Sequence, residues 1–251
     1  MPPVPPLPDQ RTAPAAWFRP PIRWGIGDFF VVFFVGIVVA TFVGAATISI
    51  AGWDAGDLTD PEKLLLNGVS GIGQFAGFAA IAALVLRLKG HGVVRDLGLF
   101  ADRNLGMIAL SLVAGFASSI GFGILVLPIS HLADGERQEL VDQIDNGSGV
   151  GLLLLVLTAG VLAPLLEEIL FRGLLLRSLL RRMPAGAALL VSAAVFGVVH
   201  LIDPKSFPAL PALIGVGLVC GWLAIRTGGL ARPIAFHMGF NLFTVIVSIA
   251  S

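Results

Sequence analysis

The residues best able to do chemistry in this sequence are three ionisable side chains inside an apolar stretch. Glu167, Glu168 and Arg172 lie in a segment that runs from about Val150 to Leu180 and is rich in Leu, Val and Gly. A charged side chain at the centre of a membrane helix costs at least ~2.5–3.5 kcal/mol, so such groups mark functional sites. Removal from water favours the neutral form of a carboxyl group, which can then exchange a proton near neutral pH.

The spacing of these residues separates the two carboxylates. Glu168 and Arg172 are four positions apart with the acid first, which is the order that lets a helix pair them. Glu167 lies about 100° around the helix from Glu168, and the residue four positions after it is Phe171. We therefore predict a structural ion pair between Glu168 and Arg172. Glu167 is then the carboxylate available for proton transfer.

Two later apolar segments carry further polar pairs at helical spacing. Phe196 and His200 are four residues apart, and so are His237 and Asn241. Each pair therefore shares one face of its helix. For His200 alone, a packing role is as good an explanation as a functional one. For His237 and Asn241, hydrogen bonding between membrane helices is the alternative.

The composition indicates the environment in which these residues act. Of the 251 residues, 56% are hydrophobic and 13% are charged, and the mean hydropathy is +0.93. A soluble domain has about a quarter of its residues charged, so this is the composition of a polytopic membrane protein. The net charge of zero gives no indication of a nucleic-acid partner. The single cysteine, Cys220, excludes an intramolecular disulfide and is expected in the apolar core.

Apolar segments of membrane-spanning length make up most of the chain. Each is near the ~20 residues that cross the hydrocarbon layer, and they predict an all-α transmembrane bundle of about seven helices. Residues 1–24 are rich in proline and are expected to form a disordered cytoplasmic tail. Three helices follow in residues 25–148, and residues 149–251 form the helix bundle that carries the polar motifs, in which Pro164 is expected to kink the long fourth segment. The predicted spans are 26–50, 64–88, 105–130, 149–180, 185–201, 209–226 and 231–250.

The basic residues predict the orientation. With the N-terminus inside, the cytoplasmic segments contain Arg11, Arg19, Arg23, Arg87, Lys89, Arg95, Arg103, Arg177, Arg181, Arg182, Arg226 and Arg232. The external loops contain only Lys63, Arg137 and Lys205, and the acidic side chains gather there. This bias predicts an integral, multi-pass protein of the plasma membrane with a cytoplasmic N-terminus and an external C-terminus.

Residue counts give the depth of each polar group in the membrane. Glu167 lies some sixteen residues before the turn at Met183 and His200 some fifteen after it, so both are about 22–25 Å from that turn at ~1.5 Å per residue. His237 lies only about six residues past the turn at 228–232. By this count His237 is shallower than its expected partners.

Together the three motifs resemble the CPBP family of intramembrane proteases, also called the CAAX protease/Abi family, which includes the type II CAAX prenyl endopeptidases. The family pattern is Glu-Glu-x-x-x-Arg, Phe-x-x-x-His and His-x-x-x-Asn on separate membrane helices. The resemblance covers about residues 150–250, and with the loop charges it favours a bacterial membrane. The matching residues are Glu167, Glu168, Arg172, Phe196, His200, His237 and Asn241.

The resemblance implies hydrolysis of a peptide bond in a membrane-associated substrate, which in some relatives is prenylated or otherwise lipidated. By analogy, Glu167 and His200 would activate a water molecule. His237 and Asn241 would donate hydrogen bonds to the oxyanion, and membrane lipid would surround the site. Glu168, Arg172 and Phe196 would support these groups.

Three alternatives accompany this interpretation. Glu167, His200 and His237 could supply a zinc triad, but the sequence has no His-Glu-x-x-His motif. We therefore favour a reaction without a metal or other cofactor. A non-catalytic scaffold or immunity protein would tolerate replacement of the same residues. A small transporter or proton relay would also place Glu and His within the membrane.

Overall fold

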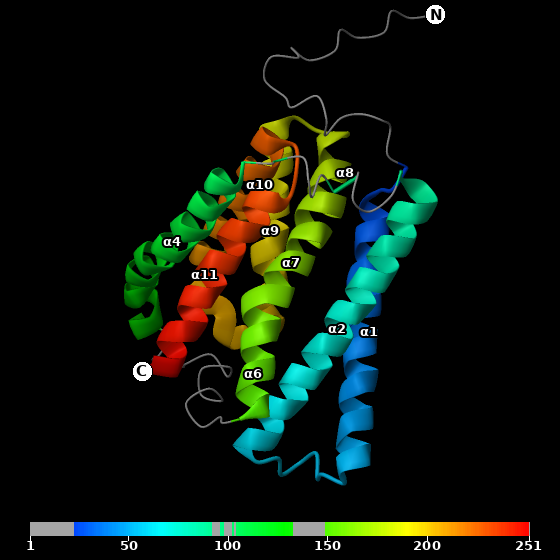
Figure 1. Cartoon of the computed structure of the whole chain (residues 1–251), viewed down its shortest axis with the longest axis vertical. Coiled ribbons are helices and arrows are strands. Elements are labelled where there is room, and N and C mark those ends of the chain that lie inside the picture. Colours follow the sequence, from blue (N-terminus) through cyan, green and yellow to red (C-terminus); the bar gives the residue numbers. More distant parts are fainter. Residues whose placement is uncertain (1–22, 92–95, 98–101, 103, 133–148, 251) are drawn as a thin grey trace, which may run out of the picture.

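The computed structural model describes residues 23–250 except for 92–95, 98–101, 103 and 133–148. Of the predicted tail, only Arg23 and Trp24 lie within the described part. The described residues form a bundle of long helices (Figure 1). This confirms the predicted all-α architecture.

Each predicted span corresponds to a helix or to a run of joined helices. The α-helices are α1 (Ile26–Ala51), α2 (Asp60–Lys89), α4 (Leu105–Leu132), α6 (Val150–Leu157), α7 (Ala163–Glu168), α8 (Arg177–Leu180), α9 (Ala185–Val199), α10 (Leu210–Thr227) and α11 (Ala231–Ala250). Two π-helices, η1 (Thr158–Leu162) and η2 (Ile169–Leu176), join α6 to α7 and α7 to α8. Two 3₁₀-helices, η3 (His200–Ile202) and η4 (Pro204–Ala209), connect α9 to α10.

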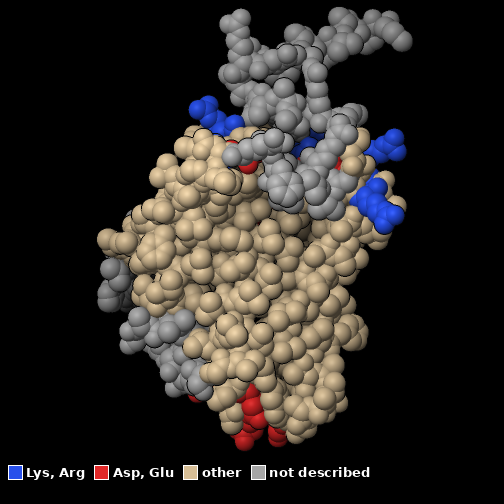
Figure 2. Space-filling model, viewed as in Figure 1, with Lys and Arg blue, Asp and Glu red and all other residues tan. Residues whose placement is uncertain are grey.

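Six helices in the described residues are long and apolar enough to cross a membrane, and a shorter apolar helix covers Ala231–Val247. The protein is therefore an integral membrane protein. The face shown in Figure 2 is uncharged over most of its length, with Lys and Arg at one end and Asp and Glu mainly at the other. The acidic end carries the α1–α2 connection, and the basic end carries α8 and the α10–α11 turn (Figure 1). The side of the membrane that each end faces stays a prediction.

The fourth segment passes through the middle of the bundle and changes its winding twice. Pro164 lies at the start of α7, directly after η1. Proline has no N–H group to donate to the preceding turn, and the π-helical stretch lies in that preceding turn; the kink expected at Pro164 stays a prediction. A second π-helix follows Glu168. Short π-helical stretches occur frequently at functional sites, and here they flank the helix that carries both glutamates.

Helix α11 is held against α4 by direct backbone contact (Figure 1). A Cβ atom added to Gly239 would lie 2.0 Å from the carbonyl oxygen of Leu112, and one added to Gly115 would lie 1.8 Å from that of Phe236. Small residues let membrane helices approach this closely. The contact fixes the position of α11, which carries His237 and Asn241.

Candidate active site

Glu168 and Arg172 form the predicted ion pair. Glu168 Oε1 lies 2.8 Å from Arg172 Nη1, and both side chains are buried. Arg172 Nη2 also donates a hydrogen bond of 3.1 Å to the carbonyl oxygen of Gly217 on α10. The guanidinium group lies 4.6 Å from the centroid of the Phe196 ring, a favourable cation–π distance. The pair therefore links the fourth segment to α9 and α10.

His237 lies between the two carboxylates. Its Nδ1 is 2.9 Å from Glu168 Oε1, and its Nε2 is 3.7 Å from Glu167 Oε2. A carboxylate that pairs with Arg172 accepts hydrogen bonds and does not donate them, so Nδ1 of His237 is the donor in this bond. A second proton on Nε2 would make the charges of Glu167, Glu168, Arg172 and His237 sum to zero. Charge balance of this kind suits a site removed from water.

Phe196 connects the two histidines. Its ring centroid lies 5.5 Å from that of His237 and 4.8 Å from that of His200. His200 Nδ1 is 2.7 Å from the carbonyl oxygen of Phe196. Since a carbonyl oxygen only accepts, Nδ1 is the donor, and the neutral ring has its lone pair on Nε2. In this form His200 is suited to accept a proton as a general base.

Asn241 lies one helical turn after His237 and is bonded to the fourth segment. Its Nδ2 donates a hydrogen bond of 2.9 Å to the carbonyl oxygen of Ala159 in η1. The side-chain amide has two N–H groups, so one hydrogen remains for another acceptor. Asn241 thus ties α11 to the π-helix that precedes the glutamates.

The difference in depth that residue counts give for His237 is closed in the structure, where Nδ1 of His237 lies 2.9 Å from Glu168 Oε1. Leu230 in the α10–α11 turn is fully buried, and its Cδ1 would lie 3.6 Å from a Cβ atom placed on Gly173. The residues of the α8–α9 turn, Arg181 and Arg182, are exposed. The α10–α11 turn thus packs beside Gly173, whereas the end of the fourth segment extends further to exposed residues, and this offset brings His237 to the level of Glu168.

The structure brings Glu167 next to His237, whereas the resemblance pairs it with His200. Among the hydrogen bonds and ion pairs of the described residues, Glu167 contacts His237 and none joins it to His200. The bond from Nδ1 of His200 to Phe196 holds that imidazole against the end of α9. Glu167 keeps 19% of its side chain exposed, whereas Glu168 is fully buried. Glu167 is thus the carboxylate that a substrate or water molecule can reach.

The alternative zinc triad of Glu167, His200 and His237 is not among the close groups of possible ligands in the described residues. Among the described residues, one group of three possible ligands has its atoms within 4.8 Å of one another, and it consists of Glu168, Cys220 and His237. All three are buried, whereas a catalytic zinc ion needs an open position for water. Arg172 and His237 already engage the same oxygen of Glu168. These contacts disfavour a metal-bound water at Glu168.

The backbone acceptors of the site could not be identified from the sequence. The carbonyl groups of Ala159 and Gly217 bind Asn241 and Arg172, and neither residue has a side chain that signals this role. Cys220 is buried as predicted, with Sγ 3.6 Å from the carbonyl oxygen of Pro233. The signal that was available is the run of small residues on α10, Gly217, Cys220, Gly221 and Ala224, all of them buried.

Comparison with known proteins places this site in a family context. Residues 149–243 match the family described as "Type II CAAX prenyl endopeptidase Rce1-like", which confirms the resemblance to the CAAX proteases. The chain is 26% identical over 201 residues to the "Putative membrane peptidase YdiL" of Bacillus subtilis (strain 168), covering 79% of each chain. It is 38% identical over 90 residues to an "Uncharacterized 24.3 kDa protein" of Escherichia coli, covering 34% of this chain and 40% of that one. No solved structure gives a significant match.

Proposed function

We propose that this chain, whose residues 149–243 match the Rce1-like family, is an intramembrane endopeptidase that cleaves a membrane-associated substrate. The observation that carries the proposal is the position of His237. It lies between Glu168 and Glu167 and against the same phenylalanine as His200. The carboxylates of Glu167 and Glu168, the imidazoles of His200 and His237 and the amide of Asn241 thus lie in the same part of the bundle.

In the proposed reaction, a water molecule lies between Glu167 and His200. The carboxylate of Glu167 accepts one proton of this water while its oxygen attacks the scissile carbonyl carbon, and His200 Nε2 accepts a hydrogen bond from its other O–H group. The same proton then passes to the leaving amine, which balances the reaction. The 3.7 Å between Glu167 Oε2 and His237 Nε2 exceeds an ordinary hydrogen bond, so a substrate atom or water can share this region.

The oxyanion would be stabilised from α11. His237, held at Nδ1 by Glu168, can donate through Nε2 when protonated, and Asn241 has one N–H group left beyond its bond to Ala159. Loss of one such donor costs about 2.7–4 kcal/mol in enzymes that use them. The buried Glu168–Arg172 pair would act indirectly, because it fixes the orientation of His237.

The proposed substrate is a polypeptide with a lipidated or otherwise membrane-associated end. An apolar anchor would hold the scissile bond near the bundle, and the partly exposed side of Glu167 would admit it. The prenyl group of CAAX substrates is one such anchor, and the family description names it. We propose a bacterial plasma membrane as the location, with the basic end of the bundle in the cytoplasm.

The test is cleavage of a library of lipidated and unlipidated peptides by the purified protein in detergent, with and without a chelator. The Glu167→Gln variant is compared with Glu62→Gln, which makes the same change at the exposed start of α2. We expect cleavage that survives the chelator, disappears in Glu167→Gln and persists in Glu62→Gln. Full turnover by Glu167→Gln would overturn the proposal. Activity lost on chelation and restored by zinc would favour the metal-dependent reaction instead.

A further inference from the structure

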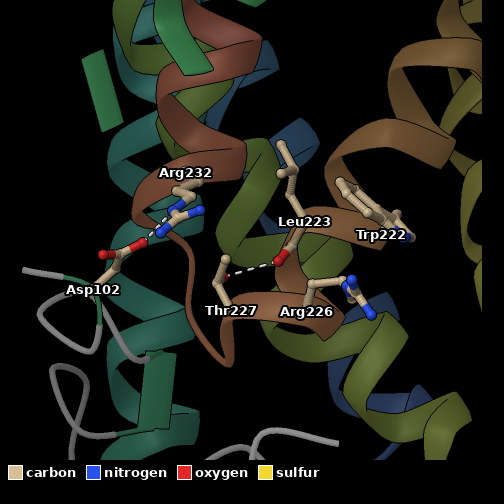
Figure 3. Close-up of a pocket in the computed structure, with 6 residues that line it drawn as sticks. All are labelled: Asp102, Trp222, Leu223, Arg226, Thr227 and Arg232. Carbon is tan, nitrogen blue, oxygen red and sulfur yellow. Dashed lines mark hydrogen bonds and ion pairs between the residues drawn. The ribbon is translucent and has the colours of Figure 1, made fainter. Parts of the chain in front are cut away.

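A second site lies at the basic end of the bundle, outside the candidate active site. A cavity of about 420 Å³ opens there between the end of α10 and the start of α11 (Figure 3). Its volume is within the range of ~300–1,000 Å³ typical of ligand sites. The lining residues are Asp102, Trp222, Leu223, Arg226, Thr227 and Arg232.

The charges of this cavity favour an anion. Arg232 forms an ion pair with Asp102 through Nε, and among the described residues no acceptor is bonded to its two Nη groups. Burial raises the pKa of the Asp102 carboxyl, but the hydrogen bonds from Arg232 and the backbone of Asn104 outweigh it and lower this pKa below its usual value. Asp102 is therefore an anion that neutralises Arg232. Within the described part of the chain, no carboxylate pairs with Arg226, so the lining residues carry one net positive charge.

Arg226 is presented on the outer side of α10 beside an aromatic residue. Its guanidinium carbon lies 5.6 Å from the centroid of the Trp222 ring, and half of Trp222 is exposed. Figure 3 shows Arg226 and Arg232 on opposite sides of the segment that carries Leu223 and Thr227. The cavity is therefore lined by a guanidinium group on either side of this segment.

The position of the cavity relative to the membrane identifies the class of ligand. Tryptophan is enriched where the hydrocarbon layer meets the head groups, and Trp222 lies one helical turn before Arg226, near the end of an apolar helix. Basic pockets between membrane helices bind the head groups of anionic lipids. The amino-terminal end of α11 adds positive potential beside Arg232.

We propose that this cavity binds the phosphate group of an anionic phospholipid, with Arg226 as the principal contact and Arg232 as the second. Trp222 and Leu223 would contact the first carbons of the lipid. Free inorganic phosphate has the same oxygen chemistry but no apolar part, so it would gain nothing from Trp222. The inference does not depend on the proposed peptidase activity.

The experiment measures binding of short-chain phosphatidylglycerol to the full-length protein in detergent by native mass spectrometry. Short-chain phosphatidylcholine and inorganic phosphate are measured under the same conditions. The variant is Arg226→Gln, and the matched control is Arg87→Gln, which removes another exposed arginine from the last turn of α2 at the same end. Both arginines are exposed, and an unchanged melting temperature would confirm that each variant folds.

We expect about tenfold weaker binding of phosphatidylglycerol in Arg226→Gln, which corresponds to about 1.4 kcal/mol, and less than a twofold change in Arg87→Gln. An equal loss in both variants would mean diffuse attraction to the basic end and would overturn the proposal. Equal binding of phosphatidylcholine would also overturn it, because net lipid charge would then be irrelevant. Displacement of the lipid by an equal concentration of inorganic phosphate would reassign the cavity to free phosphate.

Discussion

Nδ1 of His237 lies 2.9 Å from Oε1 of Glu168, although the two residues are 69 positions apart in the chain. The same oxygen of Glu168 is 2.8 Å from Arg172. One buried carboxylate thus balances an arginine of its own helix and orients an imidazole of another. The structural pair and the candidate catalytic histidine are parts of one polar network.

Glu168→Gln should destabilise the protein strongly. It leaves Arg172 charged and buried without its counter-ion, and breaking a buried pair on one side typically costs about 3–5 kcal/mol. The melting temperature in detergent measures the effect. A Glu168→Met, Arg172→Met double variant, which removes both charges, should be more stable than the single variant. If the single variant has the same melting temperature as the wild type, Glu168 does not form an ion pair with Arg172.

Glu167→Gln should have the opposite profile. Glu167 is partly exposed and lies 3.7 Å from His237, so the amide should leave the melting temperature almost unchanged. Under the proposed function, turnover should fall by about 10²–10⁴-fold, because the amide cannot accept the proton of water. Thermal unfolding and peptide cleavage of one preparation give both readings. Equal losses of stability and activity would instead assign Glu167 a structural role.

Asn241→Ala should affect both the contact with η1 and the reaction. The lost hydrogen bond to Ala159 costs about 0.5–1.5 kcal/mol of stability. Loss of an oxyanion donor would lower the turnover number by about 10²–10³-fold with little change in KM. The control is Thr244→Ala, one turn after Asn241 on α11. It removes a hydroxyl group that donates a hydrogen bond to the carbonyl oxygen of Phe240. A variant with wild-type turnover would limit Asn241 to helix packing.

Gly239→Ala should loosen α11 from α4. The new Cβ would lie 2.0 Å from the carbonyl oxygen of Leu112, and overpacking of this kind typically costs about 1–3 kcal/mol. Gly121→Ala on α4 is the matched control, because a Cβ atom there meets nothing within 4 Å. We expect the melting temperature to fall only in Gly239→Ala. Because His237 is two residues from Gly239, peptidase activity should fall together with the melting temperature.

The Asp102–Arg232 ion pair predicts a pH dependence. Because the pKa of Asp102 is lower in the folded protein than its ordinary value of ~3.9, the pair stabilises the fold fully above about pH 4. This stabilisation is lost as the pH falls through the folded-state pKa. The difference in melting temperature between wild type and Asp102→Asn should therefore shrink at acidic pH. A difference that grows on acidification would contradict the lowered pKa.

The positions of the helices and one side-chain pair could be predicted from the sequence. Apolar runs of membrane length mark the helices, and the four-residue spacing identifies the pair of Glu168 and Arg172. Both signals are local. The partner of Glu167 could not be predicted in this way, because it depends on how α11 is placed against the fourth segment. Packing of Leu230 near Gly173 contributes to that placement, and no local pattern encodes it.

The backbone contacts of the site could not be predicted from the sequence either. A carbonyl group such as that of Ala159 is present at every position, and only the tertiary fold selects the one that binds Asn241. The π-helical stretches also have no clear sequence signal apart from Pro164. Spacing rules assume a uniform winding of the helix, and the fourth segment departs from it on both sides of the glutamates.

The two π-helices around α7 have a consequence for sequence length. A π-helical turn closes its hydrogen bond over one residue more than an α-helical turn, so η1 accommodates residues that a regular helix would not. Deleting one residue from η1 would turn α6 by about 100° relative to α7. Glu167 and Glu168 would keep their places beside His237, while α6 would present a different side to the lipid. In this part of the chain, a change in length therefore acts as a rotation of α6 about its axis.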